Sequence, residues 1–97
     1  MEISKSDWKL FREKLPDWQE NYVERLLKRY IKNLNDESKP ASTKFWELEK
    51  QIKKDRRHPG VIMELEKSET VWNIVELLRK KVITQKELVD FIDDLQQ

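Results

Sequence analysis

Apolar side chains recur at intervals of three and four residues along most of the chain, which is the spacing of one helix face. Helices are predicted over residues 6–15, 17–34, 43–57, 61–81 and 85–95. The second predicted helix has a broad apolar face, so we expect it to contact two neighbouring elements. That face comprises Trp18, Tyr22, Val23, Leu26, Leu27, Tyr30, Ile31 and Leu34.

The stretch 61–81 is the expected centre of the fold. Residues 71–78 are apolar on nearly every side, which is typical of a helix surrounded by others. Residues 67–70 are polar, so the sequence leaves open whether 61–81 forms one helix or two. A strand over 61–65 is poorly supported, because no other segment has the alternating apolar and polar pattern of a partner strand. The sequence therefore predicts an all-α fold, a compact bundle of about five helices around the central helix 61–81, in a single domain 1–97.

Local signals mark where these helices begin and end. Pro16, the polar stretch 33–41 and the turn 58–60 are expected to separate helices, and Ser42 is a plausible cap for helix 43–57. The stretch 84–87, Thr-Gln-Lys-Glu, matches a capping box, with apolar residues in the two positions of a hydrophobic staple. The staple residues are Ile83 and Leu88.

Composition narrows the class of protein. The 97 residues are 40 % charged, against about 25 % in an average domain, but the signs balance to a net charge of +1 and four Trp favour folding. The absence of Cys excludes disulfides and thiolate sites. Apolar runs fall far short of the roughly 18 residues of a membrane span, and the start lacks a signal-peptide pattern. We therefore expect a soluble, cytoplasmic protein with no membrane partner.

A basic segment at 50–58 is one candidate site. Its cations are Lys50, Lys53, Lys54, Arg56 and Arg57, and they outnumber the single acid of the segment. Such a cluster can follow nucleic-acid phosphates, with an aromatic ring one turn earlier to stack on a base. The interpretation that we favour is a solvated helix end whose cations offset the helix dipole.

Catalytic and metal sites have little support. His58 is the only histidine, it lies in a predicted turn, and no nucleophile and acid are marked as its partners. Asp90, Asp93 and Asp94 lack the loop pattern of a calcium site. We therefore expect no enzyme activity, no cofactor and no metal.

The tryptophans are the other candidates. Trp8, Trp18 and Trp72 fall on apolar stripes and are expected in the core. Trp46 lies about 100° from the stripe of its helix, so it either packs against a second neighbour, which we favour, or is an exposed anchor for a partner.

Residues 44–50 (Lys-Phe-Trp-Glu-Leu-Glu-Lys), followed by Ile-Lys at 52–53, Asp55 and Pro-Gly-Val at 59–61, form a further pattern. In this pattern, and in residues 72–75 and 82–84, the chain resembles a family of short bacterial proteins that are often labelled "multidrug transporter". The resemblance implies a small intracellular protein without an established activity, so it assigns no functional residue. The label does not suit this chain, because a transporter must cross the bilayer.

These observations favour a protein–protein interaction or regulatory module without catalysis. The expected partner is another protein or a second copy, since the broad apolar face of helix 17–34 also suits a homodimer. The expected contact residues are Trp46 and the cations of the segment 50–58. The alternative is nucleic-acid binding through that basic segment.

Overall fold

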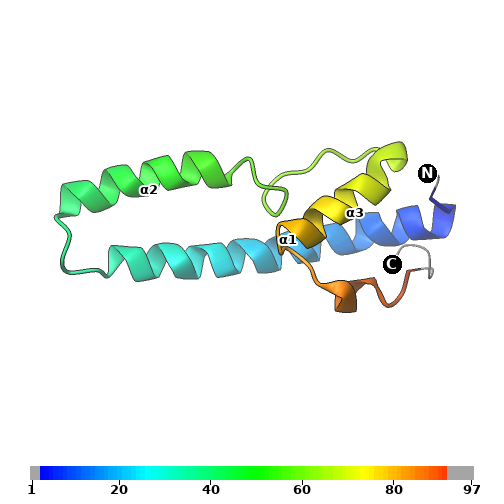
Figure 1. The fold of residues 1–97 in the computed structure, drawn as a ribbon, viewed down its shortest axis with the longest axis horizontal. Helices are drawn as coiled ribbons and strands as arrows, with labels where there is room; N and C mark the ends of the chain where they lie inside the picture. Colours follow the sequence, from blue (N-terminus) through cyan, green and yellow to red (C-terminus); the bar gives the residue numbers. More distant parts are fainter. Residues whose placement is uncertain (1–2, 92–97) are drawn as a thin grey trace.

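The structure is a computed structural model that describes residues 3–91. This part of the chain forms three α-helices and two short 3₁₀ helices, without a strand (Figure 1). They are α1 (Lys5–Leu34), α2 (Ala41–Asp55), η1 (Lys67–Glu69), α3 (Thr70–Arg79) and η2 (Gln85–Leu88). The predicted helical character is confirmed, whereas the bundle of about five helices around a central helix 61–81 is wrong.

The long helix α1 is the element on which the others are built. It runs through Pro16, where the sequence predicted a boundary between two helices. A proline inside a helix costs about 3 kcal/mol. The buried stripe nevertheless continues in phase on both sides of the proline, and each such side chain contributes about 1.5–3 kcal/mol on burial. The stripe comprises Phe11, Leu15, Trp18, Tyr22, Leu26 and Tyr30.

The C-terminal part of α1 and the whole of α2 form an antiparallel hairpin that extends away from α3 (Figure 1). We call residues 26–57 the arm and the remaining described residues the body. The arm makes the molecule elongated, with extents of 52 × 22 × 19 Å. The expected cap at Ser42 is wrong, because α2 already begins at Ala41 and its N-cap position, Pro40, has no side-chain hydrogen bond.

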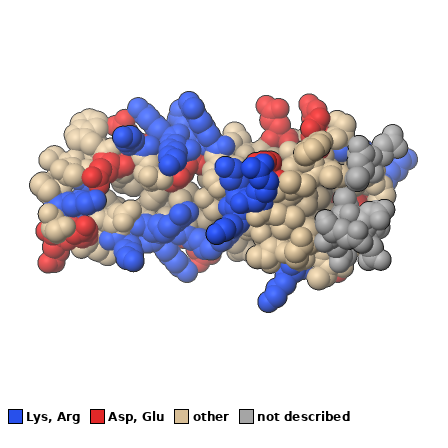
Figure 2. Space-filling view, in the orientation of Figure 1, with Lys and Arg blue, Asp and Glu red and all other residues tan. Residues whose placement is uncertain are grey.

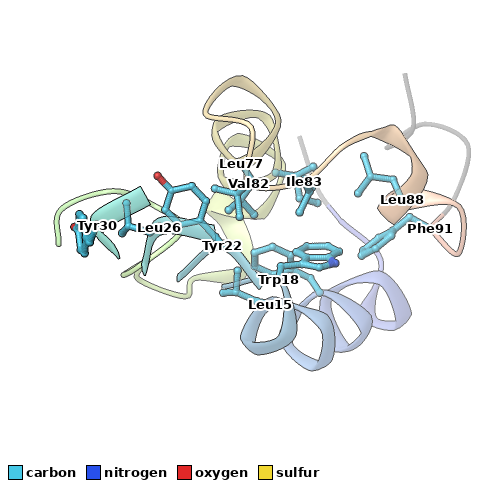
Figure 3. Packing of buried hydrophobic residues seen from close by; sticks show 12 residues of the cluster. Leu15, Trp18, Tyr22, Leu26, Tyr30, Leu77, Val82, Ile83, Leu88 and Phe91 are labelled. Carbon is cyan, nitrogen blue, oxygen red and sulfur yellow. The ribbon is translucent and has the colours of Figure 1, made fainter. Parts of the chain in front are cut away.

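Most of the core lies in the body, where α3 and the chain after it cover the N-terminal part of α1, and only Leu26 and Tyr30 of the buried cluster belong to the arm (Figure 3). Leu15, Trp18 and Tyr22 of α1 meet Leu77 and Val82 in this view. The other buried members contributed by α3 and the segment after it are Ile74, Ile83, Leu88 and Phe91. Trp18 is therefore in the core as predicted, whereas Trp8 is only partly buried.

The stretch 61–81 is not a single helix. Residues 62–66 have no regular structure, η1 follows, and only 70–79 form α3, so the polar residues 67–70 lead into a single helix and do not divide two. Ile74 and Leu77 are buried, but Trp72 is 67 % exposed, and its predicted place in the core is wrong. The reason is that α3 is covered on one side, where it meets α1, and no other α-helix of residues 3–91 surrounds it (Figure 1).

The capping residues at 84–87 start a shorter element than predicted. The Glu87 carboxylate accepts hydrogen bonds from the Thr84 amide and hydroxyl, both at 2.6 Å, and the hydroxyl bond is the main cause of its lowered pKa. Ile83 and Leu88, the expected staple, are both buried. Only the 3₁₀ helix η2 follows, and residues 92–95 of the predicted last helix lie outside the described residues.

Candidate functional site

A short loop fastens the end of α2 to α1. The His58 ring stacks on Tyr22, with ring centroids 4.4 Å apart and planes 5° apart. The Gln19 side-chain amide donates to the Pro59 carbonyl at 3.0 Å, and the Gly60 amide donates to His58 Nδ1 at 3.0 Å. Burial lowers the pKa of His58, and the nearby charge of Lys80 lowers it further. The neutral imidazole is thus the form that suits this loop.

Polar contacts also join the two helices of the arm. The Tyr30 hydroxyl donates to Asp55 Oδ2 at 2.5 Å, and burial, followed by this bond, raises the pKa of Tyr30. The Gln51 amide donates to both oxygens of the same carboxylate, at 3.0 and 3.1 Å. The contact of α2 with α1 therefore combines hydrogen bonds with the packing of the partly buried Leu48, and no residue of α2 is fully buried.

Apolar side chains of the arm remain in solvent. Leu27 and Ile31 of α1 are 51 % and 57 % exposed, and Phe45 and Ile52 of α2 are 60 % and 44 % exposed. Trp46 is 63 % exposed and meets the Phe45 ring edge-on, with centroids 4.9 Å apart. Exposed apolar clusters of this kind mark interaction surfaces in stable proteins. The favoured interpretation of Trp46, packing against a second neighbour, is therefore wrong, because the side chain is exposed.

Apart from Trp46, these exposed residues lie on one side of the hairpin. On α1, Leu27 and Ile31 each come one position after a buried residue. On α2, Ile52 comes one position after Gln51, which lines a hollow together with Tyr30. Because α1 and α2 are antiparallel, a step of one residue along each helix rotates the side chain toward the same side. We call this side the apolar face. Its residues are Leu27, Ile31, Leu34, Phe45 and Ile52, and Trp46 borders it through its ring contact with Phe45.

Residues that come one position before a residue at the α1–α2 contact lie on the opposite side of the hairpin, as the same helix geometry requires. There, Arg25 and Arg29 of α1 and Lys54 of α2 share a groove of about 550 Å³ with Lys80 and Lys81. Lys and Arg side chains gather in the middle of the face shown in Figure 2. We call this the basic groove, and its other lining residues are Tyr22, Gln51, Asp55 and His58.

The end of α3 presents two of these cations. The Val82 amide donates to the Leu77 carbonyl at 2.9 Å and the Lys81 amide to the Leu78 carbonyl at 3.1 Å, which is a Schellman motif. Lys81 has a φ of 61° at the position where such motifs favour glycine. The Arg25 guanidinium donates to the carbonyls of Lys81 and Val82, at 3.3 and 3.0 Å, and so ties this turn to α1.

The structure separates the cations of the predicted basic segment. Only Lys54 lines the basic groove, while Lys53 and Arg56 border a shallow apolar hollow that contains Phe45 and Ile52. Lys50 lines a third hollow near the tip of the arm, and Arg57 lines none of these hollows. Lys53 also forms an ion pair with Glu49 at 2.8 Å. The five residues therefore do not form one surface together.

Sequence reasoning missed four of the five cations of the basic groove. Arg25, Arg29, Lys80 and Lys81 come from stretches more than 50 residues apart, so no local run of charge announces their meeting. The one indication in the sequence was the run of cations at 79–81, at the end of a predicted helix. Cations are common at helix C-termini, where they offset the helix dipole, so this run did not point to a binding site.

Comparison with family models, with curated proteins and with solved structures finds no match for this chain. The resemblance to the short proteins labelled as transporters therefore stays a prediction. Across residues 3–91, none of the helices combines the length and apolar character that crossing a membrane requires. The same residues contain no group of three or more His, Asp or Glu placed to hold a metal, and Asp93 and Asp94 lie outside the described residues.

Proposed function

We propose that this protein is an interaction module that docks a partner protein on the apolar face of its arm. One observation carries the proposal: α2 has no buried residue, yet it keeps Phe45, Trp46 and Ile52 in solvent beside the exposed leucine and isoleucine of α1. A helix of this length gains little stability from its own hydrogen bonds and normally depends on a buried face. A partner that covers the apolar face would supply that burial.

The shape of the apolar face suits a helix as its occupant. Two helices lying side by side offer a shallow groove between them, and an amphipathic helix laid in it buries a stripe of apolar residues. Covering side chains as exposed as Phe45 and Trp46 stabilises a complex by about 1.5–3 kcal/mol each. Tryptophan is also enriched among the residues that contribute most to binding.

The charge of the arm selects an acidic partner. Residues 26–57 contain ten Lys and Arg against five Asp and Glu, a net charge of +5. Lys53 and Arg56 stand at the edge of the apolar face, beside Phe45 and Ile52. We infer that the occupant is an acidic amphipathic helix, because two arms of the same sign repel each other when they pair. A homodimer through the arms is thus an alternative outcome of the experiment below.

Nucleic-acid binding by the basic segment 50–58 has weaker support as the main function. A strand of nucleic acid needs a continuous row of cations to follow its phosphates. The five cations of the segment border three different hollows or none, and Lys53 is engaged by Glu49.

The proposal is tested by titrating the full chain with a designed acidic helical peptide that has leucine on one face and glutamate elsewhere. We expect the peptide to bind and Trp46→Glu to weaken the binding at least tenfold, since this change puts a charge on the docking surface. Trp72→Glu is the matched control, because Trp72 is 67 % exposed against 63 % for Trp46 but lies on α3. We expect it to bind like the wild type.

Calorimetry measures the affinities, and sedimentation equilibrium of the chain alone measures self-association. Equal losses in both tryptophan variants, or no binding of the peptide by the wild type, would contradict the proposal. A stable dimer that Trp46→Glu dissociates would replace the acidic helix by a second copy as the occupant.

A further inference from the structure

We propose that the basic groove, on the side of the arm opposite the apolar face, binds a ligand carrying adjacent phosphate groups. Five cations from three separate parts of the chain surround this groove, and Asp55 is the one carboxylate that lines it among residues 3–91. Both oxygens of that carboxylate already accept hydrogen bonds from Tyr30 or Gln51. The groove therefore contains five positive charges against one negative charge.

The cations are not neutralised by their neighbours. Across residues 3–91, none of the five is within ion-pair distance of a carboxylate, and the ammonium groups of Lys54, Lys80 and Lys81 have no hydrogen-bond partner there. The two arginines use part of their donors on neutral oxygens of the protein, namely two backbone carbonyls and the Tyr22 hydroxyl. Like charges held this close repel one another, and an anion between them removes that repulsion.

Phosphate fits this set of donors better than a single carboxylate. Guanidinium groups bind phosphate oxygens as planar forks, and ammonium groups bind them as point charges. The groove contains both kinds, with Arg25 and Arg29 on one wall and Lys80 and Lys81 on another. Its volume of about 550 Å³ falls within the roughly 300–1,000 Å³ of small-ligand sites, which leaves room for more than one phosphate group.

The conformation of Lys81 adds a second argument. A lysine with φ near 61° occupies a region that glycine adopts without strain. Lysine at this position keeps a cation in the groove at the expense of local backbone strain. Strained residues cluster at functional sites, which accords with a ligand at this place.

Two kinds of ligand share this chemistry: a free diphosphate, such as a nucleotide, and the backbone of a nucleic acid. The experiment titrates the full chain, in low salt, with inorganic pyrophosphate, adenosine diphosphate and a thymidine 12-mer, and uses a hexaglutamate peptide as an anion without phosphate. We expect pyrophosphate to bind. Arg29→Gln and Lys81→Gly should each weaken it about tenfold, because each removes one charge-assisted contact.

Lys28→Gln is the matched control variant. Lys28 precedes Arg29 on α1, is exposed, and approaches Glu24 at 4.0 Å outside the groove. We expect it to bind pyrophosphate like the wild type, and circular dichroism checks that all three variants keep their helices. A 12-mer that binds at least tenfold more tightly than the two small ligands identifies a nucleic acid as the source of the phosphates, and a weaker 12-mer identifies a free diphosphate.

Three results would overturn the proposal: no binding of any phosphate probe, hexaglutamate bound as tightly as pyrophosphate, or equal losses in Lys28→Gln and Arg29→Gln. None of them bears on the apolar face, because the acidic peptide docks on the other side of the arm.

Discussion

At the scale of single residues, the loop after α2 depends on the absence of a side chain at Gly60. A Cβ at this position would lie 2.5 Å from Cγ and 2.9 Å from Cε2 of the Tyr22 ring, which His58 stacks against. This overlap cannot be relieved at the end of a flexible chain, because the ring is buried. The only glycine of the chain thus fixes where the arm joins the body.

Gly60→Ala is therefore expected to lower the free energy of unfolding by about 1–3 kcal/mol, the usual range for an overpacked site. Urea denaturation followed by circular dichroism measures the loss. Combining Gly60→Ala with Tyr22→Leu gives the control, since the smaller side chain makes room and the two effects should not add. Simple additivity, or a Gly60→Ala protein as stable as the wild type, would show that the ring and the loop do not touch as described.

At the scale of elements, the end of α3 is under strain. Lys81, in the left-handed conformation of a Schellman motif, is destabilised relative to glycine by about 1 kcal/mol. Its neighbour Lys80 has an ordinary φ of −87° and carries the same charge. The two lysines therefore separate a backbone effect from a charge effect.

We expect Lys81→Gly to raise the free energy of unfolding by about 1 kcal/mol. Lys80→Gly should instead lower it by about 0.5–1 kcal/mol, because glycine loses more conformational freedom on folding. Thermal or urea unfolding of both variants gives the comparison. If Lys81→Gly destabilises the protein as much as Lys80→Gly does, the turn has another conformation.

The sequence anticipated the helical character of the chain, but not the number of its α-helices or their boundaries. Apolar residues three and four positions apart predicted the helical character, but Pro16, where a helix boundary was predicted, lies inside α1, because the stripe around Leu15 and Trp18 stays in phase across it. The apolar run at 71–78 predicted a fully surrounded helix, whereas its tryptophan is exposed. Local patterns measure how apolar a segment is, but they do not reveal which neighbours cover it.

The candidate sites were predictable to different degrees. Trp46 stood out because it falls off the stripe of its own helix, but the favoured interpretation, packing against a second neighbour, is wrong because the side chain is exposed. The basic groove was not visible in the sequence, since Arg25, Lys54 and Lys80 meet only through the way the arm joins the body. The run of charge at 50–57 indicated a site that helix geometry divides among several surfaces.

At the scale of the whole molecule, the arm and the body differ in how they are held. The body contains most of the buried side chains, whereas α2 is held to α1 by a few hydrogen bonds, the partly buried Leu48 and one stacked loop. The apolar face and the basic groove both depend on the arm extending from the body. Any rearrangement that folded α2 back onto the core would bury the apolar face and separate the residues of the basic groove.

The most direct measurement of this central claim is the radius of gyration of the monomer, from X-ray scattering extrapolated to zero concentration. The extended arm gives a Cα radius of gyration of 16.5 Å, so we expect a value near this. A globular domain of this length would give about 12.5 Å. A measured value close to the globular one would mean that the arm is folded against the body and that neither site is formed as described.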